Sequence, residues 1–264
     1  MPNLIKAMPV GDLWATRNGF VLLTITTSAL SLVGGAIPLL MRNGPYPFPS
    51  SKAFSCRSIP DILCRSPGCA LAILAYCGHM WELYAVWSSV PSFLLANLAA
   101  RGYPTAEATY QAALYSFFII AIGGLGCVCC AVLAQRWGRI AVCALCSAAS
   151  GACCLLVGPA SNPASAATLA PTVALLLFWG FVVLPDSPQY TTLVIELVEP
   201  SVVGTALVLQ QALGYLVTIP TIFIMPLLAD DAAFGWQRAY SVLAPGARAR
   251  RVRAARHLPK MQPS

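Results

Sequence analysis

Three ionisable side chains occur in apolar stretches where a membrane-spanning helix is expected. His79 and Glu82 lie in residues 69–98, which carry no other formal charge, and Asp186 lies near the middle of residues 171–197. About 20 apolar residues suffice to cross the hydrocarbon core of a bilayer. An ionisable group at that depth is unfavourable unless it faces a protein interior or an aqueous path. These residues therefore predict a chain that handles a solute or a proton within a membrane.

The spacing of these residues suggests how helices present them. His79 and Glu82 are three residues apart, which places them on one face of a helix. Residues 185–189 read Pro-Asp-Ser-Pro-Gln, and the two prolines interrupt the hydrogen-bond ladder as in the discontinuous helices of transporters. Two simpler interpretations stay open. Asp186 could cap the helix that restarts after the break, and His79 and Glu82 could bond only to neighbouring helices.

Uncharged amides extend this candidate site, although hydrogen bonding between helices is the competing interpretation for those at 210 and 211. The candidate residues for substrate binding or proton coupling are His79, Glu82, Asp186, Gln189, Gln210 and Gln211.

Composition places the chain among membrane proteins. Hydrophobic residues make up 58% of the 264 residues, charged residues make up 9%, and the mean hydropathy is +0.73. The net charge of +7 does not indicate nucleic-acid binding, because the cations lie between apolar runs and in the last 17 residues. The fold class predicted is an all-α, polytopic membrane helix bundle, since no alternating strand pattern occurs. We expect six spans, at residues 20–40, 69–98, 105–134, 140–160, 171–197 and 202–228.

The basic residues conflict with six spans. Lys6 and Arg17 precede the first span, while Arg42 and Lys52 follow it, and the positive-inside rule would place both flanks in the cytoplasm. A similar conflict occurs at the other end. Three spans separate the basic loop at 135–139 from the arginine-rich tail, so the two lie on opposite sides of the membrane, although the positive-inside rule would place both in the cytoplasm. One crossing is therefore expected to be missing near each end. We expect residues 41–68 and the loop at 135–139 to be cytoplasmic.

One loop resembles a motif of the major facilitator superfamily. Residues 131–139 are similar to the family's G-x-L-A-D-R-x-G-R loop, with Ala131 at the glycine position and Gln135 at the aspartate position. The matching residues are Leu133, Ala134, Arg136, Gly138 and Arg139. Glu199-Pro200 followed by Gly204-Thr-Ala resembles the family's region between the tenth and eleventh helices.

The resemblance implies a partial facilitator fold. Residues 20–40 look like the fifth helix, the next five spans look like helices seven to eleven, and Gly235 to Tyr240 resembles the opening of the twelfth. The expected domains are residues 1–40 with one transmembrane helix, a cytoplasmic linker at 41–68, a five-helix bundle at 69–228, and a truncated last helix with a basic tail at 229–264. The chain as given is then expected to be an incomplete transporter that does not transport alone.

The function expected is secondary transport of a small solute across the cell (inner or plasma) membrane, with no enzymatic activity and no cofactor or metal. One alternative is a non-transporting remnant of a deleted or frameshifted gene. A second is a membrane thiol-redox protein using Cys143 and Cys146, although buried cysteines usually act as small hydrophobes. The expected partners are membrane lipid and an unidentified solute, and no nucleic acid is expected. The chain is expected either to form a homo-oligomer or to have no protein partner. The sequence does not identify the substrate, the direction of transport or the coupling ion.

Overall fold

The computed structural model describes residues 17–40, 55–161, 169–230 and 235–243, all of which are helices, turns or short connections without a strand. The parts of the predicted linker at 41–54 and of the predicted basic tail at 244–264 lie outside the described residues, as do Lys6, Arg42 and Lys52. The helices are α2 (Arg17–Ala36), α3 (Ile59–Arg65), α4 (Pro67–Ala100), α5 (Thr105–Trp137), α6 (Arg139–Ala160), α7 (Ala170–Val183), α8 (Asp186–Leu197), α9 (Val203–Asp230) and α10 (Gly235–Ala239), with 3₁₀ turns at Ile37–Leu40, Cys56–Ser58, Pro200–Val202 and Tyr240–Leu243.

Six segments of the described chain are long and apolar enough to cross a membrane. They coincide with the six predicted spans, with ends that differ by a few residues, so the chain is an all-α, multi-pass membrane protein. Local sequence explains several helix starts. Ser66 is the N-cap residue of α4 and Pro67 occupies its first turn, where a missing backbone N–H is tolerated. Pro171 lies in the first turn of α7 in the same way.

The fifth span is broken into α7 and α8 at Pro185. A proline cannot donate to the carbonyl four residues earlier, which here belongs to Phe181. That carbonyl faces Gly126 of α5, where a Cβ atom would collide with its oxygen. A Cβ on Gly180 of α7 would likewise collide with the carbonyl of Ile119. Glycines on both helices therefore allow α5 and α7 to pack closely where the ladder is interrupted.

Other glycines on α5 and α9 differ in whether they allow close packing. Gly123, like Gly126, faces α7, whereas Gly124 faces open space. On α9, Gly214 contacts the ring of Tyr76, and Gly204 has no neighbour within 4 Å. Close packing therefore depends on which face of the helix a glycine occupies.

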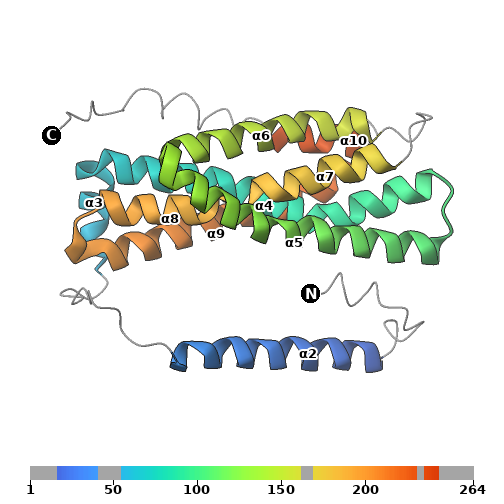
Figure 1. Ribbon diagram of the computed structural model, residues 1–264, viewed down its shortest axis with the longest axis horizontal. Coiled ribbons are helices and arrows are strands. Elements are labelled where there is room, and N and C mark those ends of the chain that lie inside the picture. The colour runs from blue at the N-terminus through green and yellow to red at the C-terminus, as the bar shows by residue number, and fades with distance from the viewer. Residues whose placement is uncertain (1–16, 41–54, 162–168, 231–234, 244–264) are drawn as a thin grey trace.

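Helices α4 to α9 form one bundle, in which α4 runs along α9 and α5 runs along α7 (Figure 1). Helix α2 lies apart from that bundle in Figure 1, and no residue from 21 to 40, in α2 or in the 3₁₀ turn after it, is buried. Helix α3 lies within the predicted linker and buries Ile62 against the bundle. Successive long helices reverse direction, so α3, the α5–α6 junction and the end of α8 lie at one end of the bundle (Figure 1).

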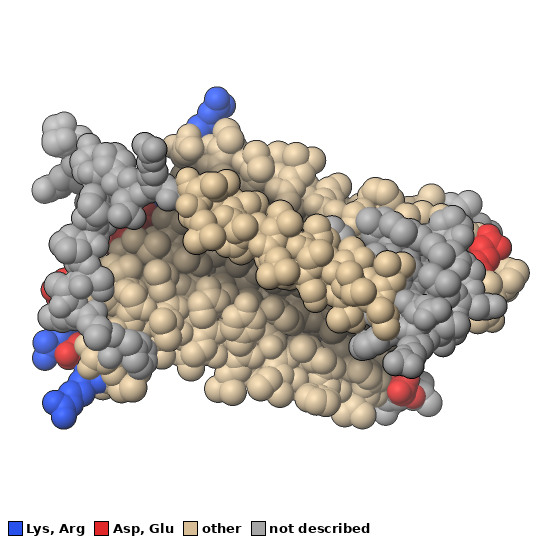
Figure 2. All heavy atoms as spheres, turned by 90° about the horizontal axis from the view of Figure 1, so that it is seen from below, with Lys and Arg blue, Asp and Glu red and all other residues tan. Residues whose placement is uncertain are grey.

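Charges concentrate at the ends of the bundle. On the face drawn in Figure 2, the blue Lys and Arg atoms lie toward the end that holds α3, while the long middle is uncharged. Arg65 and Arg139 are at that end, the latter bonded to Glu196 at the end of α8. An uncharged middle between charged ends is the distribution expected of a protein that spans a bilayer.

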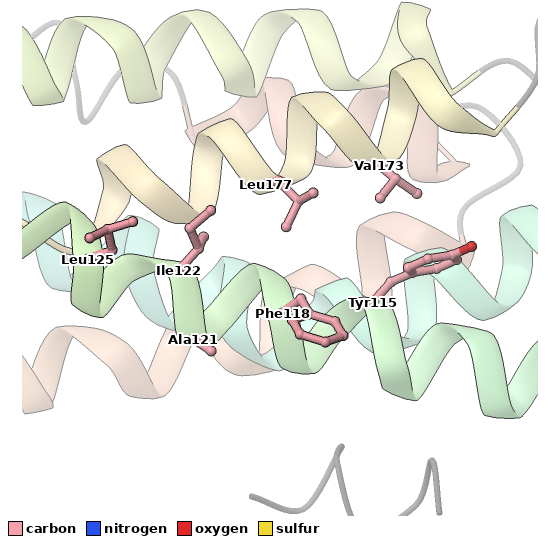
Figure 3. Close-up of a pocket in the computed structure, with 7 residues that line it drawn as sticks. All are labelled: Tyr115, Phe118, Ala121, Ile122, Leu125, Val173 and Leu177. Carbon is pink, nitrogen blue, oxygen red and sulfur yellow. The ribbon is translucent and has the colours of Figure 1, made fainter.

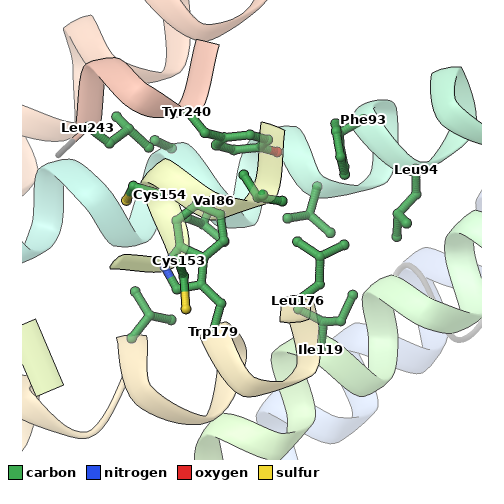
Figure 4. Packing of buried hydrophobic residues seen from close by; sticks show 14 of the residues in the cluster. Val86, Phe93, Leu94, Ile119, Cys153, Cys154, Leu176, Trp179, Tyr240 and Leu243 are labelled. Carbon is green, nitrogen blue, oxygen red and sulfur yellow. The ribbon is translucent and has the colours of Figure 1, made fainter. Parts of the chain in front are cut away.

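The largest apolar cluster lies toward the opposite end of the bundle, among α4, α5, α6, α7 and the short segment 235–243 (Figure 4). Trp179, Tyr240, Phe93 and Leu94 are its bulkiest fully buried members. Of these, Tyr240 belongs to the final 3₁₀ turn. Residues 235–243, which include the segment that resembles the start of a twelfth helix, thus contribute to the core of the bundle.

Candidate functional site

His79 and Asp186 form a buried acid–base pair near the centre of the bundle. The Nδ1 atom of His79 on α4 lies 2.7 Å from Oδ1 of Asp186, and their side chains are 1% and 3% exposed. Asp186 occupies the first turn of α8, where the positive end of the helix dipole favours a carboxylate. Pro185 is the N-cap residue of α8, so Asp186 lies one position inside the helix, and its carboxylate contacts His79.

Helix α6 contributes a serine to this pair. Ser147 Oγ lies 3.5 Å from Oδ2 of Asp186 and 3.4 Å from the hydroxyl of Tyr190. Tyr190 is on α8, one turn beyond Asp186, and its ring centroid is 6.2 Å from that of His79. The other ring nitrogen of His79, Nε2, is buried and has no hydrogen-bond partner among the described residues. One histidine nitrogen therefore has an acidic partner while the other is available.

Glu82 forms a second polar centre one helical turn away on α4. Its Oε1 atom accepts hydrogen bonds from the hydroxyl of Ser150, from the Cys154 thiol at 3.3 Å and from the Trp179 indole at 3.3 Å. The indole N–H also donates to Ser150 Oγ at 2.8 Å. Glu82 is 1% exposed, so its carboxylate is held by side chains of α6 and α7 rather than by solvent or lipid.

The two centres are adjacent because two helices carry matching pairs. His79 and Glu82 are three residues apart on α4, and Ser147 and Ser150 are three residues apart on α6. Residues at this spacing are neighbours on one helix face. Both pairs lie near the middle of their helices, at the depth where lipid would be most unfavourable for them. The result is a polar layer across the centre of the bundle.

The three glutamines lie outside this layer's direct contacts. Gln189 accepts a hydrogen bond from Arg139 Nη1 at 3.2 Å, which joins it to the predicted loop motif. Gln210 is fully buried and donates weakly to Thr191 at 3.4 Å, while its Oε1 has no hydrogen-bond partner among the described residues. Gln211 accepts from the hydroxyl of Tyr76 at 2.8 Å. The structure thus brings His79, Glu82 and Asp186 together but distributes the amides along α8 and α9.

The predicted loop motif forms the junction of α5 and α6. Gly138 has φ of 82°, a conformation that favours glycine, and it connects two antiparallel helices. Ala134 is buried and Leu133 packs beside it, whereas Arg136 is exposed. Arg139 lies 2.9 Å from Glu196, which ties this junction to the end of α8.

Sequence reasoning missed the donors around the carboxylates. Ser147, Ser150, Trp179 and Tyr190 were not singled out, because isolated serines and aromatics are common in membrane helices. One signal was available: Ser147 and Ser150 repeat the three-residue spacing of His79 and Glu82.

The cysteines pair differently from their sequence spacing. Cys143 and Cys146 are both buried on α6, but Cys146 Sγ lies 3.6 Å from Cys130 Sγ of α5. Within the described ranges, no group of three or more His, Cys, Asp or Glu side chains is placed to hold a metal ion.

An apolar groove of about 500 Å³ lies between α5 and α7 (Figure 3). Phe118, Leu125 and Leu177 line it, and Tyr115 lies at one end. It contains none of the candidate site residues, and exposed apolar side chains such as Phe118 and Leu125 are what a lipid-facing surface requires. We therefore locate the candidate site in the polar layer and not in this groove.

Comparison with known proteins gives no relative: no family model, no curated protein and no solved structure matches this chain. Function must therefore be inferred from the residues and their geometry.

Proposed function

We propose that this chain is a secondary transport protein of the major facilitator type, in which His79, Glu82 and Asp186 bind the coupling proton. The observation that carries the proposal is the polar layer: three ionisable side chains from two helices lie near the middle of the bundle, and each is at most 3% exposed. Ionisable groups within a membrane commonly mark ion or proton paths. The junction motif ending in Arg136, Gly138 and Arg139 supports the family assignment.

The site favours a proton over a larger ligand at the carboxylates. Glu82 and Asp186 are enclosed by side chains that already bond to them, so a solute could reach them only if helices separated. A proton needs only a basic atom with a lone pair, and Nε2 of a neutral His79, which has no hydrogen-bond partner among the described residues, provides one. We place the protein in the cell membrane and assign it a small-molecule solute.

The side chains of the polar layer all come from α4, α6, α7 and α8, so this proposal departs from the expectation that the chain does not transport alone. Proton-driven accumulation decides between the two. The purified chain is reconstituted in liposomes with an inside-alkaline pH gradient, and a mixture of sugars, amino acids, organic anions and organic cations is offered outside. Mass spectrometry then identifies any accumulated compound. We expect accumulation that depends on the gradient and that falls at least tenfold in Glu82→Gln and Asp186→Asn.

Glu107→Gln is the matched control, because Glu107 is an exposed carboxylate that bonds only to its neighbour Gln111 on α5. It should transport like the unmodified chain. If no compound accumulates, the non-transporting alternative is favoured; if Glu82→Gln accumulates normally, the proton-binding role is wrong.

A thiol function is the second candidate, and the observation that favours it is the 3.6 Å approach of Cys130 and Cys146. Alkylation in detergent tests it, because a working thiol pair must react when the protein is folded. Modification confined to the exposed Cys56, Cys64 and Cys129 would exclude this function.

A further inference from the structure

The segment 235–243 reaches the candidate site through a chain of aromatic contacts. Ala239 and Tyr240 are fully buried and Leu243 is 1% exposed, although the segment comprises only one helical turn and a 3₁₀ turn. It packs against α4, α6 and α9. These three buried side chains are therefore the ones through which residues 235–243 contact the core of the bundle.

Tyr240 makes three directional contacts. Its hydroxyl lies 2.9 Å from Ser89 Oγ on α4. Its ring meets that of Trp179 at a centroid distance of 5.2 Å and an angle of 77°, and that of Phe93 at 5.4 Å and 83°. Figure 4 draws Tyr240 with Phe93 beside it and Trp179 below. Edge-to-face pairs of this kind are favourable and fix the relative orientation of the rings.

The orientation of the Trp179 ring determines a contact with Glu82. The indole carries a single N–H, which is 2.8 Å from Ser150 Oγ and 3.3 Å from Glu82 Oε1. A tilt of the ring would move this donor away from both acceptors, since hydrogen bonds weaken steeply with distance and angle. Trp179 is fully buried, and Tyr240 contacts the ring directly.

We propose that Tyr240 is a positioning residue: its ring holds the Trp179 indole where the N–H donates to Ser150 and Glu82. This inference rests on the proposed role of Glu82 for its functional meaning, but the geometric part is independent of transport. It links residues 235–243 to a carboxylate about 10 Å further along α4, since Glu82 and Ser89 are seven positions apart on that helix.

The experiment observes the Trp179 indole directly. The full chain, with ¹⁵N-labelled tryptophan, is purified in nanodiscs, and the indole N–H signals of its six tryptophans are recorded by NMR. Trp179→Phe identifies the relevant signal, and single Phe replacements of the other tryptophans identify it by elimination if that variant does not fold. We first expect Glu82→Gln to shift the Trp179 signal, because Glu82 accepts from that N–H.

Tyr240→Leu should shift the same signal and make its hydrogen exchange about tenfold faster, which corresponds to losing one edge-to-face aromatic pair. Tyr240→Met provides the same test if Tyr240→Leu does not fold. Tyr240→Phe keeps the ring and should restore the behaviour of the unmodified chain. Phe93→Leu is the matched control. Phe93 contacts Tyr240 in the same cluster, and in the described part of the chain its ring does not stack on that of Trp179.

Unchanged Trp179 exchange in Tyr240→Leu and Tyr240→Met would overturn the proposal, and so would an equal change in Phe93→Leu, which would indicate general loosening. An unshifted Trp179 indole N–H signal in Glu82→Gln would also overturn it. If the NMR results are as expected while the unmodified chain shows no gradient-driven uptake, the positioning role stands and the proposed transport function fails.

Discussion

The buried contact between His79 and Asp186 should contribute measurably to stability, and a double-mutant cycle isolates its contribution. Removing one partner of a buried pair leaves the other uncompensated, which is destabilising by about 3 to 5 kcal/mol. With a separation of 2.7 Å and exposures of 1% and 3%, this pair meets the conditions for that range. Asp186→Asn and His79→Gln should each fall within it. The double variant should be less destabilised than the sum of the two by about 2 kcal/mol, because neither partner is then left alone.

The assay is reversible unfolding of the purified chain in mixed micelles with increasing SDS, followed by circular dichroism. Arg65 and Asp61 supply the internal control, because they form an ion pair of 3.1 Å at the surface with side chains 81% and 59% exposed. Their coupling should be about 0.3 kcal/mol, as for other exposed pairs one helical turn apart. Additive effects at His79 and Asp186, or a coupling no larger than that of the surface pair, would refute the reasoning that links burial to the strength of this pair.

Three further predictions concern packing, topology and the thiols. Gly180→Ala should destabilise the bundle by about 1 to 3 kcal/mol because its Cβ would collide with the Ile119 carbonyl, whereas Gly124→Ala, which faces open space, should not; thermal unfolding of both variants measures the difference. Arg136→Cys and the native Cys64 should react with an impermeant thiol reagent from the same side of the membrane, and Glu107→Cys should react from the opposite side. The reason is that α4 crosses between Cys64 and Glu107, and α5 crosses between Glu107 and Arg136. Labelling of Arg136→Cys from outside the cell would contradict the cytoplasmic assignment. An oxidant such as copper phenanthroline should link Cys130 to Cys146 rather than Cys143 to Cys146, as detected by mass spectrometry of peptides, and a peptide bridging Cys143 and Cys146 would contradict the observed geometry.

The spans and the inward direction of the ionisable residues could be predicted because lipid imposes strong local rules. The length of an apolar stretch locates a crossing. The three-residue spacing of His79 and Glu82 places both on one helix face, and that face must point into the protein because exposing ionisable groups to lipid is unfavourable. Pro185 and Pro188 locate the break between α7 and α8 for a similarly local reason, since proline removes a backbone donor.

The partners of these residues could not be predicted, because they depend on how helices distant in sequence are placed. Asp186 pairs with a residue more than 100 positions earlier, and nothing local distinguishes that outcome from a helix cap. Trp179 and Tyr240 are inconspicuous in the sequence for the same reason. The Cys-x-x-Cys spacing at 143 and 146 was a misleading local signal, because Cys146 meets a cysteine of another helix.

Burial divides the candidate residues into two groups, one suited to binding a proton and one suited to contacting a solute. Glu82 and Asp186 lie between α4, α6, α7 and α8, and the donors that surround them leave no path for a solute without separation of the helices. Gln211 is only half-buried and, with Tyr76, lies along the contact of α4 with α9. If transport is established, Gln211→Ala should therefore change the apparent affinity for solute more than the dependence on the pH gradient, while Glu82→Gln should do the reverse. Uptake assays at several gradients and solute concentrations separate the two effects, and identical profiles for both variants would show that solute and proton share one site.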